Sequence, residues 1–337
     1  MGVDLGGLIP AKKIALSDLS GRTIAIDAYN ALYQFLSIIR QPDGTPLMDS
    51  KGRVTSHISG LLYRTANLVE AGIKPVYVFD GPSHPLKRST IAERVSRKEA
   101  AEKEWKEALE KGDVETARTK AMQTSRLTKE MVEQSKTLLQ AMGLPYIQAP
   151  SEGEAQASHM ARKGDVFACA SQDFDALLFG APRLIRNLAI TGRRKLPRKN
   201  VYIDVEPEII ELEGTLAALG VTREQLVDMG YLVGTDFNDG IFGIGPKKAL
   251  KLVKAHPDLC SILKALSQTE MDFEEVRSIF LNPNVTDDYQ IIFGKPDRER
   301  ILALVCGEFE FSKERVDGSI EKLENALAPK QKRLDFF

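Results

Sequence analysis

Three short apolar runs, two that end in an aspartate and one that an aspartate closely follows, constrain the fold of this chain more than any other feature of its sequence. They span residues 23–27, 75–80 and 166–170, and Asp173 comes soon after the third. The runs are short and apolar, with β-branched or aromatic residues in the first two, as expected of buried strands. Helical stretches separate them, so we expect an α/β fold with a mostly parallel central sheet and helices on both faces. Ligands of such sheets bind beyond the carboxyl ends of the strands, where these aspartates fall.

Seven carboxylates are the candidates for chemistry: Asp27, Asp80, Glu152, Glu154, Asp173, Asp175 and Asp236. Taken singly, some have structural explanations, since Ser151 and Glu154 match a helix capping box with Ser151 as the N-cap. Taken together, carboxylates at one sheet edge repel one another unless cations lie among them or their pKa values rise. Ligand sets made only of oxygen select hard ions such as Mg²⁺ or Mn²⁺. Two such ions about 3.5–4 Å apart could activate water for phosphoryl transfer, so no Ser, Cys or His nucleophile is needed.

The histidines and cysteines point to no competing chemistry. The chain has four histidines and three cysteines: His57, His84, His159, His256, Cys169, Cys260 and Cys306. The histidines form no paired motif, and we expect them to be surface or packing residues. The cysteines are odd in number and far apart, which favours reduced thiols in an intracellular protein. With no apolar run long enough to span a bilayer, we expect no membrane partner.

Two further segments suggest contacts with nucleic acid. Residues 89–142 contain no proline and are rich in Ala, Glu, Lys and Arg, which predicts polar helices broken near residues 111–113. Residues 243–248 open another helix, where glycines, Pro246 and exposed N–H groups beside Lys247 and Lys248 suit a phosphate. The formal net charge is −1, but five lysines face a single acid between residues 246 and 264. A hairpin between helices at this position would bind the DNA backbone without contacting the bases. The alternative is a plain helix-turn-helix corner with no role in binding.

Several blocks closely resemble the motifs of the flap endonucleases, a family of structure-specific 5′ nucleases. In family order, they are residues 1–5, 26–28, 78–81, 149–155, 171–175 and 234–236, and residues 243–247 resemble the family's helix–hairpin–helix. The resemblance implies one nuclease domain, residues 1–327, followed by a sliding-clamp-binding tail at 328–337. Within the domain it implies an N-terminal region at 1–98, a helical arch at about 86–130 and an internal region at about 116–258. The helix–hairpin–helix would lie at about 226–256.

The resemblance also implies roles for individual residues. Asp80, Glu152 and Glu154, together with Asp27, would lie near one Mg²⁺ ion, and Asp173, Asp175 and Asp236 near a second, with Mn²⁺ as a substitute. Lys87 and Arg94 would contact the scissile phosphate, and Tyr33 would stack on a base. The implied DNA contacts further include Gly2, Arg40, Thr55, Arg64, Gly234, Gly243, Gly245, Lys247, Lys248 and Arg315, with Thr55 and Arg315 at a pocket for a one-nucleotide 3′ flap. A K⁺ ion would bind main-chain carbonyls around Gly240, Ile241 and Ile244.

The last residues resemble the peptide box that binds a DNA sliding clamp. Gln331 and Leu334 have the family spacing, and Phe336 and Phe337 supply two aromatics. The family places two residues between the aliphatic and the aromatic pair, whereas only Asp335 stands here. Either the pair enters the clamp pocket in a shifted register, or Phe337 alone keeps its place. A frayed C-terminus is the alternative, although exposed phenylalanines are unusual in one.

We therefore expect a monomeric 5′ flap endonuclease with 5′–3′ exonuclease activity, which leaves a 5′-phosphate and a 3′-hydroxyl. Its substrate would be branched double-stranded DNA, in Okazaki fragment processing and base excision repair. It would be cytoplasmic in a prokaryote or archaeon and nuclear in a eukaryote. The alternatives are an excision-repair nuclease, an exonuclease or a junction resolvase of the same superfamily, and a non-catalytic adaptor that binds DNA and the clamp.

Overall fold

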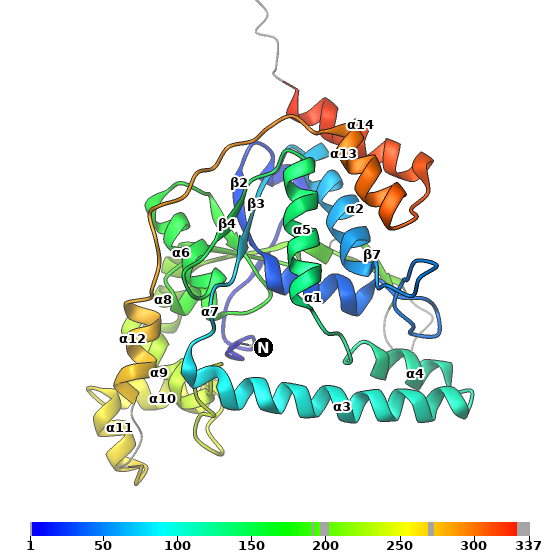
Figure 1. Cartoon of the computed structure of the whole chain (residues 1–337). Coiled ribbons are helices and arrows are strands. Elements are labelled where there is room, and N and C mark those ends of the chain that lie inside the picture. Colours follow the sequence, from blue (N-terminus) through cyan, green and yellow to red (C-terminus); the bar gives the residue numbers. More distant parts are fainter. Residues whose placement is uncertain (1, 191, 196–201, 269–272, 329–337) are drawn as a thin grey trace, which may run out of the picture.

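A seven-stranded sheet forms the centre of the protein in a computed structural model that describes residues 2–190, 192–195, 202–268 and 273–328 (Figure 1). The strand order is β1-β9-β6-β5-β2-β3-β4. The strands are β1 (Lys12–Lys13), β2 (Thr23–Asp27), β3 (Lys74–Phe79), β4 (Tyr146–Gln148), β5 (Ala168–Ala170), β6 (Arg183–Arg186) and β9 (Glu208–Glu211). The five strands from β6 to β4 run parallel, and β9 and β1 continue the sheet in antiparallel pairing. The expected mostly parallel sheet is confirmed.

Alternate residues of the central strands enter two separate apolar layers, because successive side chains of a strand point to opposite faces. Ile24 and Ile26 of β2 belong to one layer, and Ala25 between them belongs to the other. β3 behaves in the same way, with Tyr77 in the first layer and Val78 in the second. The sheet is therefore covered on both faces, as the continuous apolar runs predicted.

Helices from different parts of the chain cover the two faces. The first layer contains α1 (Ala28–Ile38), α2 (Ser56–Glu70), α5 (Lys129–Ala141), α13 (Arg298–Leu302) and α14 (Lys313–Leu327). The second contains α6 (Gly153–Lys163), α7 (Asp175–Leu178), α8 (Leu212–Leu219), α9 (Arg223–Val233), α10 (Pro246–Ala255), α11 (Leu259–Ala265) and α12 (Phe273–Leu281). Shorter elements are 3₁₀ turns at Leu16–Leu19, Pro85–Lys87 and Leu188–Ile190, a π-helical turn at Ala303–Glu308, and a separate antiparallel pair, β7 (Gly192–Lys195) with β8 (Tyr202–Val205). None of the helices in the described ranges is long and apolar enough to cross a membrane.

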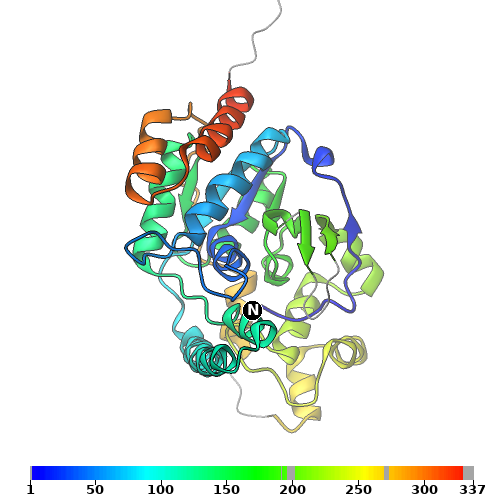
Figure 2. The ribbon, with the colours of Figure 1, turned by 90° about the vertical axis from the view of Figure 1, so that its right-hand side faces the viewer.

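Two polar helices extend along one side of the molecule, beyond the edge of the sheet (Figures 1 and 2). They are α3 (Arg88–Glu110) and α4 (Val114–Ala121), and the chain turns between them at Gly112, as the sequence predicted. At one end, Thr90 Oγ1 donates to the Asp236 carbonyl oxygen at 3.0 Å. At the other end, Ser37 of α1 donates to the Met122 carbonyl oxygen at 2.9 Å. The pair is thus tied at one end to the Asp236 loop and at the other to α1, as an arch would be.

Candidate active site

The carboxyl ends of β2 and β3 place two aspartates at the same edge of the sheet, because the two strands are parallel neighbours. Asp27 ends β2 and is the N-cap of α1, where its Oδ1 accepts from the Asn30 backbone N–H at 3.0 Å. Asp80 directly follows β3, and its Oδ1 accepts from the Gly153 N–H at 2.7 Å. A β-carbon at Gly153 would lie 2.7 Å from the same Asp80 oxygen, so only glycine permits this approach. The start of α6 therefore fixes the Asp80 carboxylate.

The capping box predicted at the start of α6 is wrong. Glu152, not Ser151, occupies the N-cap position, and no side chain caps the helix. The Glu154 carboxylate is buried and accepts from the Ser171 hydroxyl instead. Glu154 therefore does not accept a hydrogen bond from the start of its own helix and instead contacts Ser171 in the loop after β5.

The loop after β5 and the first residues of the chain complete this side of the site. Asp173 Oδ2 accepts from the Asn30 side-chain amide at 3.3 Å. Asp175 begins α7, and its Oδ1 accepts from the Val3 N–H at 2.7 Å. Gly2 lies directly against the Asp175 carboxylate, where a β-carbon would collide with it. Any side chain at position 2 would therefore displace the Asp175 carboxylate, and the predicted contact of Gly2 with DNA stays a prediction.

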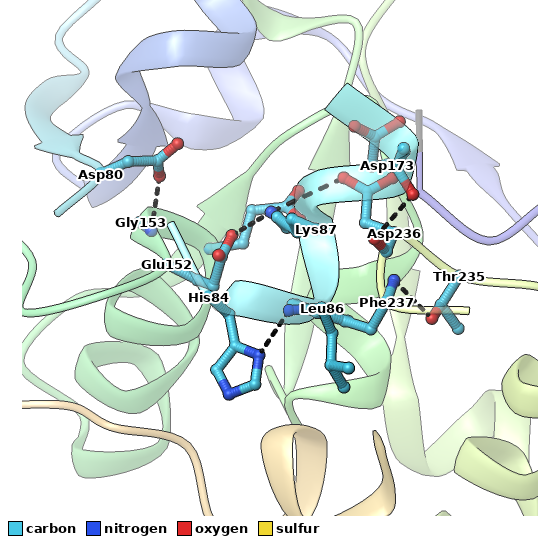
Figure 3. A network of polar contacts seen from close by, with 12 residues as sticks. Asp80, His84, Leu86, Lys87, Glu152, Gly153, Asp173, Thr235, Asp236 and Phe237 are labelled. Atoms are coloured by element: carbon cyan, nitrogen blue, oxygen red, sulfur yellow. Dashed lines mark hydrogen bonds and ion pairs between the residues drawn. The ribbon is translucent and has the colours of Figure 1, made fainter. Parts of the chain in front are cut away.

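Two cations contact the seventh carboxylate, Asp236, which lies in the loop between α9 and α10. Arg94 Nη2 is 2.5 Å from Asp236 Oδ1, and Lys87 Nζ is 3.6 Å from Asp236 Oδ2. Lys87 also donates to Glu152, so its ammonium group lies between two of the predicted site residues (Figure 3). The Phe237 ring supports Lys87 from the side, with its centroid 5.1 Å from Nζ. Lys87 and Arg94 therefore lie among the carboxylates, as their predicted place beside the reacting phosphate requires.

Burial and mutual repulsion raise the pKa values of four of the carboxylates. Burial and the charge of Glu152 raise the pKa of Asp80 to about 6, and burial and Asp173 raise that of Asp175 to about 7. Burial is also the largest cause of the raised pKa values of Asp27, beside Asp80, and of Glu154, beside Asp173. Each shift reflects desolvation of a negative charge and repulsion by neighbouring carboxylates, both of which a bound cation would offset.

Asp236 shows the opposite shift. Its burial alone would raise its pKa, but positive charges that include Lys87 and Arg94 lower it below the ordinary value. Burial alone would lower the pKa of Lys87, but the charges of Glu152, Asp236 and Asp80 raise it. The positive side chains therefore neutralise Asp236 most strongly, whereas at Asp27, Asp80 and Asp175 desolvation and repulsion outweigh the charge of Lys87.

The donor chemistry of this site fits hard divalent cations. Every candidate ligand is a carboxylate oxygen, and the raised pKa values mark charge that a cation would neutralise. As the side chains stand, no three His, Cys, Asp or Glu residues of the described segments form a group that could hold a metal ion. The carboxylates are gathered at one place, but they are not arranged as a finished coordination shell.

Asn30 is a site residue that the sequence analysis missed. Its backbone N–H holds Asp27, its side-chain amide holds Asp173, and its Oδ1 accepts from the Gln34 side chain one helical turn further on. The available signal was the position of Asn30 three residues after the strand-ending aspartate, where an N-cap carboxylate finds its backbone donor. One residue, through its backbone and its side chain, thereby connects Asp27 at the end of β2 with Asp173 in the loop after β5.

The other residues predicted to contact DNA on the α1 and α2 side have varied surroundings. The exposed ring of Tyr33 lies under the ammonium group of Lys98 from α3, 4.7 Å from its centroid. Arg40 is engaged within the protein, donating to the Gly44 carbonyl at 2.9 Å and to Ser125 Oγ at 3.0 Å. Thr55 is buried at the start of α2. Two arginines complete the group: Arg64 is partly buried in α2, and Arg315 of α14 lies over the Tyr63 ring at 5.2 Å.

The predicted phosphate-binding hairpin joins α9 to α10. Glycines with positive φ shape it, at 108° for Gly234, 70° for Gly240 and 75° for Gly243. Gly245 is the N-cap of α10, with Pro246 in the first turn, as the sequence predicted. Lys247 and Lys248 follow in the first turn, exposed and without an acidic partner among the described residues. The clamp-binding residues Gln331, Leu334, Phe336 and Phe337 lie outside the described ranges.

Comparison with known proteins shows which family this chain resembles. Residues 6–101 match the XPG N-terminal domain and residues 143–236 the XPG I-region. The flap endonuclease 1 of Thermococcus onnurineus is 55% identical over 337 residues, covering 99% of this chain and 98% of that protein. Among solved structures, flap endonuclease-1 from Methanococcus jannaschii is 44% identical with a TM-score of 0.78, covering 98% of this chain and 100% of that one. The catalytic core of Rad2 in complex with a DNA substrate is 25% identical with a TM-score of 0.67, covering 95% and 97%.

Proposed function

The chain belongs to the flap endonuclease family, and we propose that its seven gathered carboxylates serve hydrolysis of the phosphodiester bond at the base of a 5′ flap. It is a structure-specific DNA nuclease with roles in replication and repair. The observation that carries the proposal is that carboxylates with raised pKa values and positively charged side chains lie together at one edge of the sheet. Four buried or partly buried carboxylates have raised pKa values, and Lys87 and Arg94 approach Asp236 beside them.

We assign Asp27, Asp80, Glu152 and Glu154 to one divalent ion, and Asp173, Asp175 and Asp236 to a second. Mg²⁺ is the proposed ion, with Mn²⁺ as a substitute, since all the donors are oxygens. A pair of such ions supplies Lewis-acid activation of water and charge neutralisation at the reacting phosphate. In the hydrolysis, water adds to phosphorus and the bond to the 3′ oxygen breaks. The products are a 5′-phosphate and a 3′-hydroxyl.

The cations of the chain stabilise the reacting phosphate. The Lys87 ammonium group is shared between Glu152 and Asp236, so it can turn toward a phosphate that binds between these carboxylates. Arg94 reaches Asp236 from the first turns of α3 and has a planar group suited to two phosphate oxygens. Negative charge that develops on these oxygens during the reaction is then stabilised by the N–H donors of Lys87 and Arg94, which are already positioned beside the phosphate.

The remaining contacts position the DNA. Gly243, Gly245, Lys247 and Lys248 bind a duplex phosphate at the start of α10, where the N-terminal end of the helix and two lysines meet. A K⁺ ion would use the carbonyls of Gly240, Ile241 and Ile244. The Ile241 carbonyl already accepts the Ile244 N–H at 3.0 Å and has a second lone pair for this purpose. A free 5′ strand would pass between α3 and the body, where the Tyr33 ring offers a base-stacking surface.

A sliding clamp is the proposed protein partner. Gln331, Leu334 and the terminal Phe336 and Phe337 supply the polar and apolar residues that a short turn would insert into a hydrophobic pocket. The ordering of a peptide on binding costs free energy, which keeps the affinity of such contacts moderate. The clamp would stimulate cutting without taking part in the chemistry.

A cleavage assay with three substrates tests the proposed function. The substrates are a duplex with a 5′ flap and a one-nucleotide 3′ flap, a nicked duplex and a four-way junction, each with Mg²⁺ or with EDTA. We expect one main cut at the base of the 5′ flap in Mg²⁺, no cutting in EDTA, and much slower turnover of the other substrates. A preparation of the Asp173→Ala variant controls for contaminating nucleases. Cutting in EDTA, or a preference for the four-way junction, would contradict the proposal.

A further inference from the structure

A phenylalanine at the tip of the α9–α10 hairpin is more exposed than any other large hydrophobic residue in the described chain. The relative exposure of Phe242 is 104%, whereas the next value, for Ile292, is 66%. Isolated apolar residues are common on protein surfaces, but a fully exposed aromatic ring is not. The local structure shows why this ring cannot turn inward.

Phe242 occupies the corner of a tight turn that its neighbours hold in place. The Ile244 N–H donates to the Ile241 carbonyl at 3.0 Å, which closes the turn around Phe242 and Gly243. The φ of 75° at Gly243 suits the third position of a type II turn, where glycine is favoured. Ile244 is buried, and the Ile241 N–H donates to the Leu232 carbonyl at 2.9 Å. Both flanking residues therefore face the protein, and Phe242 points into solvent from a fixed backbone.

The chain that follows Phe242 is basic. Between residues 240 and 257 the charged side chains, apart from His256, are four lysines, with Asp239 directly before this stretch and Asp258 directly after it. Two of them, Lys247 and Lys248, flank the exposed N–H groups at the start of α10. The ring therefore lies beside the surface that suits a phosphate, and a basic border favours a nucleic acid over an apolar protein partner.

Phe242 is also close enough to the carboxylate site to meet the same duplex. Asp236 lies six residues earlier, so the two Cα atoms are at most about 20 Å apart even with the chain extended. One turn of B-DNA spans about 34 Å. A duplex that runs from Asp236 over the hairpin would therefore reach Phe242 within a single turn.

We infer that Phe242 packs against the deoxyribose edges of the duplex minor groove, as an uncharged contact beside the phosphate that the hairpin binds. The inference deepens the proposed function and rests on it. Between two phosphates, the sugars are the apolar part of a DNA backbone, and minor-groove-binding proteins use phenylalanine among their apolar contacts. A contact of this kind adds affinity without sequence preference, and without counterion release.

Equilibrium binding to fluorescent DNA in EDTA, over a series of salt concentrations, tests the inference in the full chain. For Phe242→Ala we expect a loss of affinity of roughly 5- to 10-fold on the two-flap duplex. The slope of log K against log salt should not change, because no charge is removed, whereas Lys247→Ala should reduce that slope by about 0.9. Phe242→Leu should stay within about 2-fold of the parent protein, since it keeps most of the apolar surface. Ile292→Ala, a matched exposed hydrophobic, should change nothing.

Three results would overturn the inference: unchanged affinity of Phe242→Ala for the duplex, a change of its salt slope, or an equal loss on a single-stranded oligonucleotide. The ring is fully exposed, so Phe242→Ala should keep the parent's melting temperature, which separates a lost contact from misfolding. Cleavage by the parent protein in Mg²⁺ tests the proposed function separately. A parent that fails to cut while Phe242→Ala still loses duplex affinity refutes the nuclease proposal, and the contact stands.

Discussion

Replacing Asp175 by asparagine should stabilise the metal-free protein at neutral and alkaline pH while it impairs cutting. Asp175 is buried at the start of α7, and burial together with Asp173 and Asp236 raises its pKa to about 7. An ionised carboxylate is therefore costly at this position. Asparagine is nearly the same size, and its oxygen can keep the hydrogen bond from the Val3 N–H.

The size of the effect follows from the pKa. The difference between about 7 in the folded protein and 3.8 in a free side chain corresponds to about 4 kcal/mol, at 1.36 kcal/mol per pKa unit. Relaxation of the coupled carboxylates reduces this upper bound, and we expect a gain of about 2 kcal/mol in the free energy of unfolding above pH 7. For a chain of 337 residues, this is a rise of about 3 °C in melting temperature.

The stability difference between Asp175→Asn and the parent protein depends on pH. Well below pH 3.8 the Asp175 carboxyl is protonated in both the folded and the unfolded protein, so the variant gains nothing. Between pH 4 and 7 the unfolded chain ionises first, and the parent protein loses stability as the pH rises. Above pH 7 both states are ionised and the loss is complete. The advantage of Asp175→Asn should therefore grow from a small value at pH 4 to its full value near pH 8.

Thermal unfolding in EDTA, followed by circular dichroism at pH 4, 6 and 8, measures this advantage. Asp288→Asn, which neutralises an exposed carboxylate, is the matched control and should shift the melting temperature little at any pH. The reasoning fails if Asp175→Asn is no more stable than the parent at pH 8, or if its gain is the same at all three pH values. Added Mg²⁺ should stabilise the parent more than the variant, because a proposed ligand is missing.

Three other changes test separate parts of the site. Asp80→Ala should abolish cutting, while flap binding survives or tightens because negative charge beside phosphates is removed; near-native turnover would show that Asp80 is not a ligand. The double change Lys247→Ala with Lys248→Ala should weaken binding and lower the salt slope by up to about 2, with the cleavage position unchanged; an unaltered slope would remove the hairpin from the contact surface. Deletion of residues 331–337 should abolish stimulation by the clamp of the same cell and leave clamp-free cutting almost intact; a full response of the truncated protein would place the contact elsewhere.

Parallel strands made much of the fold and site predictable from the sequence. Apolar runs that end in aspartate bring Asp27 and Asp80 to one edge, because neighbouring parallel strands end on the same side. The break between α3 and α4 at Gly112 and the start of α10 at Pro246 followed from local propensity and helix-end rules. The antiparallel addition of β9 and β1 was not predicted, since pairing at a sheet edge depends on distant segments.

The start of α6 shows where local rules failed. Ser151 and Glu154 have the spacing of a capping box, yet the Glu154 carboxylate contacts Ser171 after β5. A surface helix would gain from the local bond. Here the helix start is buried against the sheet edge, and a tertiary partner replaces the local one.

By itself, the sequence determined which residues carry the carboxylates, their order along the chain and the strand ends that gather them. Only the tertiary structure decided how their charges are balanced. Lys87 and Arg94 reach Asp236 from a segment far earlier in the chain and lower its pKa, whereas burial raises the pKa of Asp80 and Asp175. The physical reason is that Coulomb interactions and desolvation depend on distance and burial in space, which neighbouring residues in a sequence do not specify.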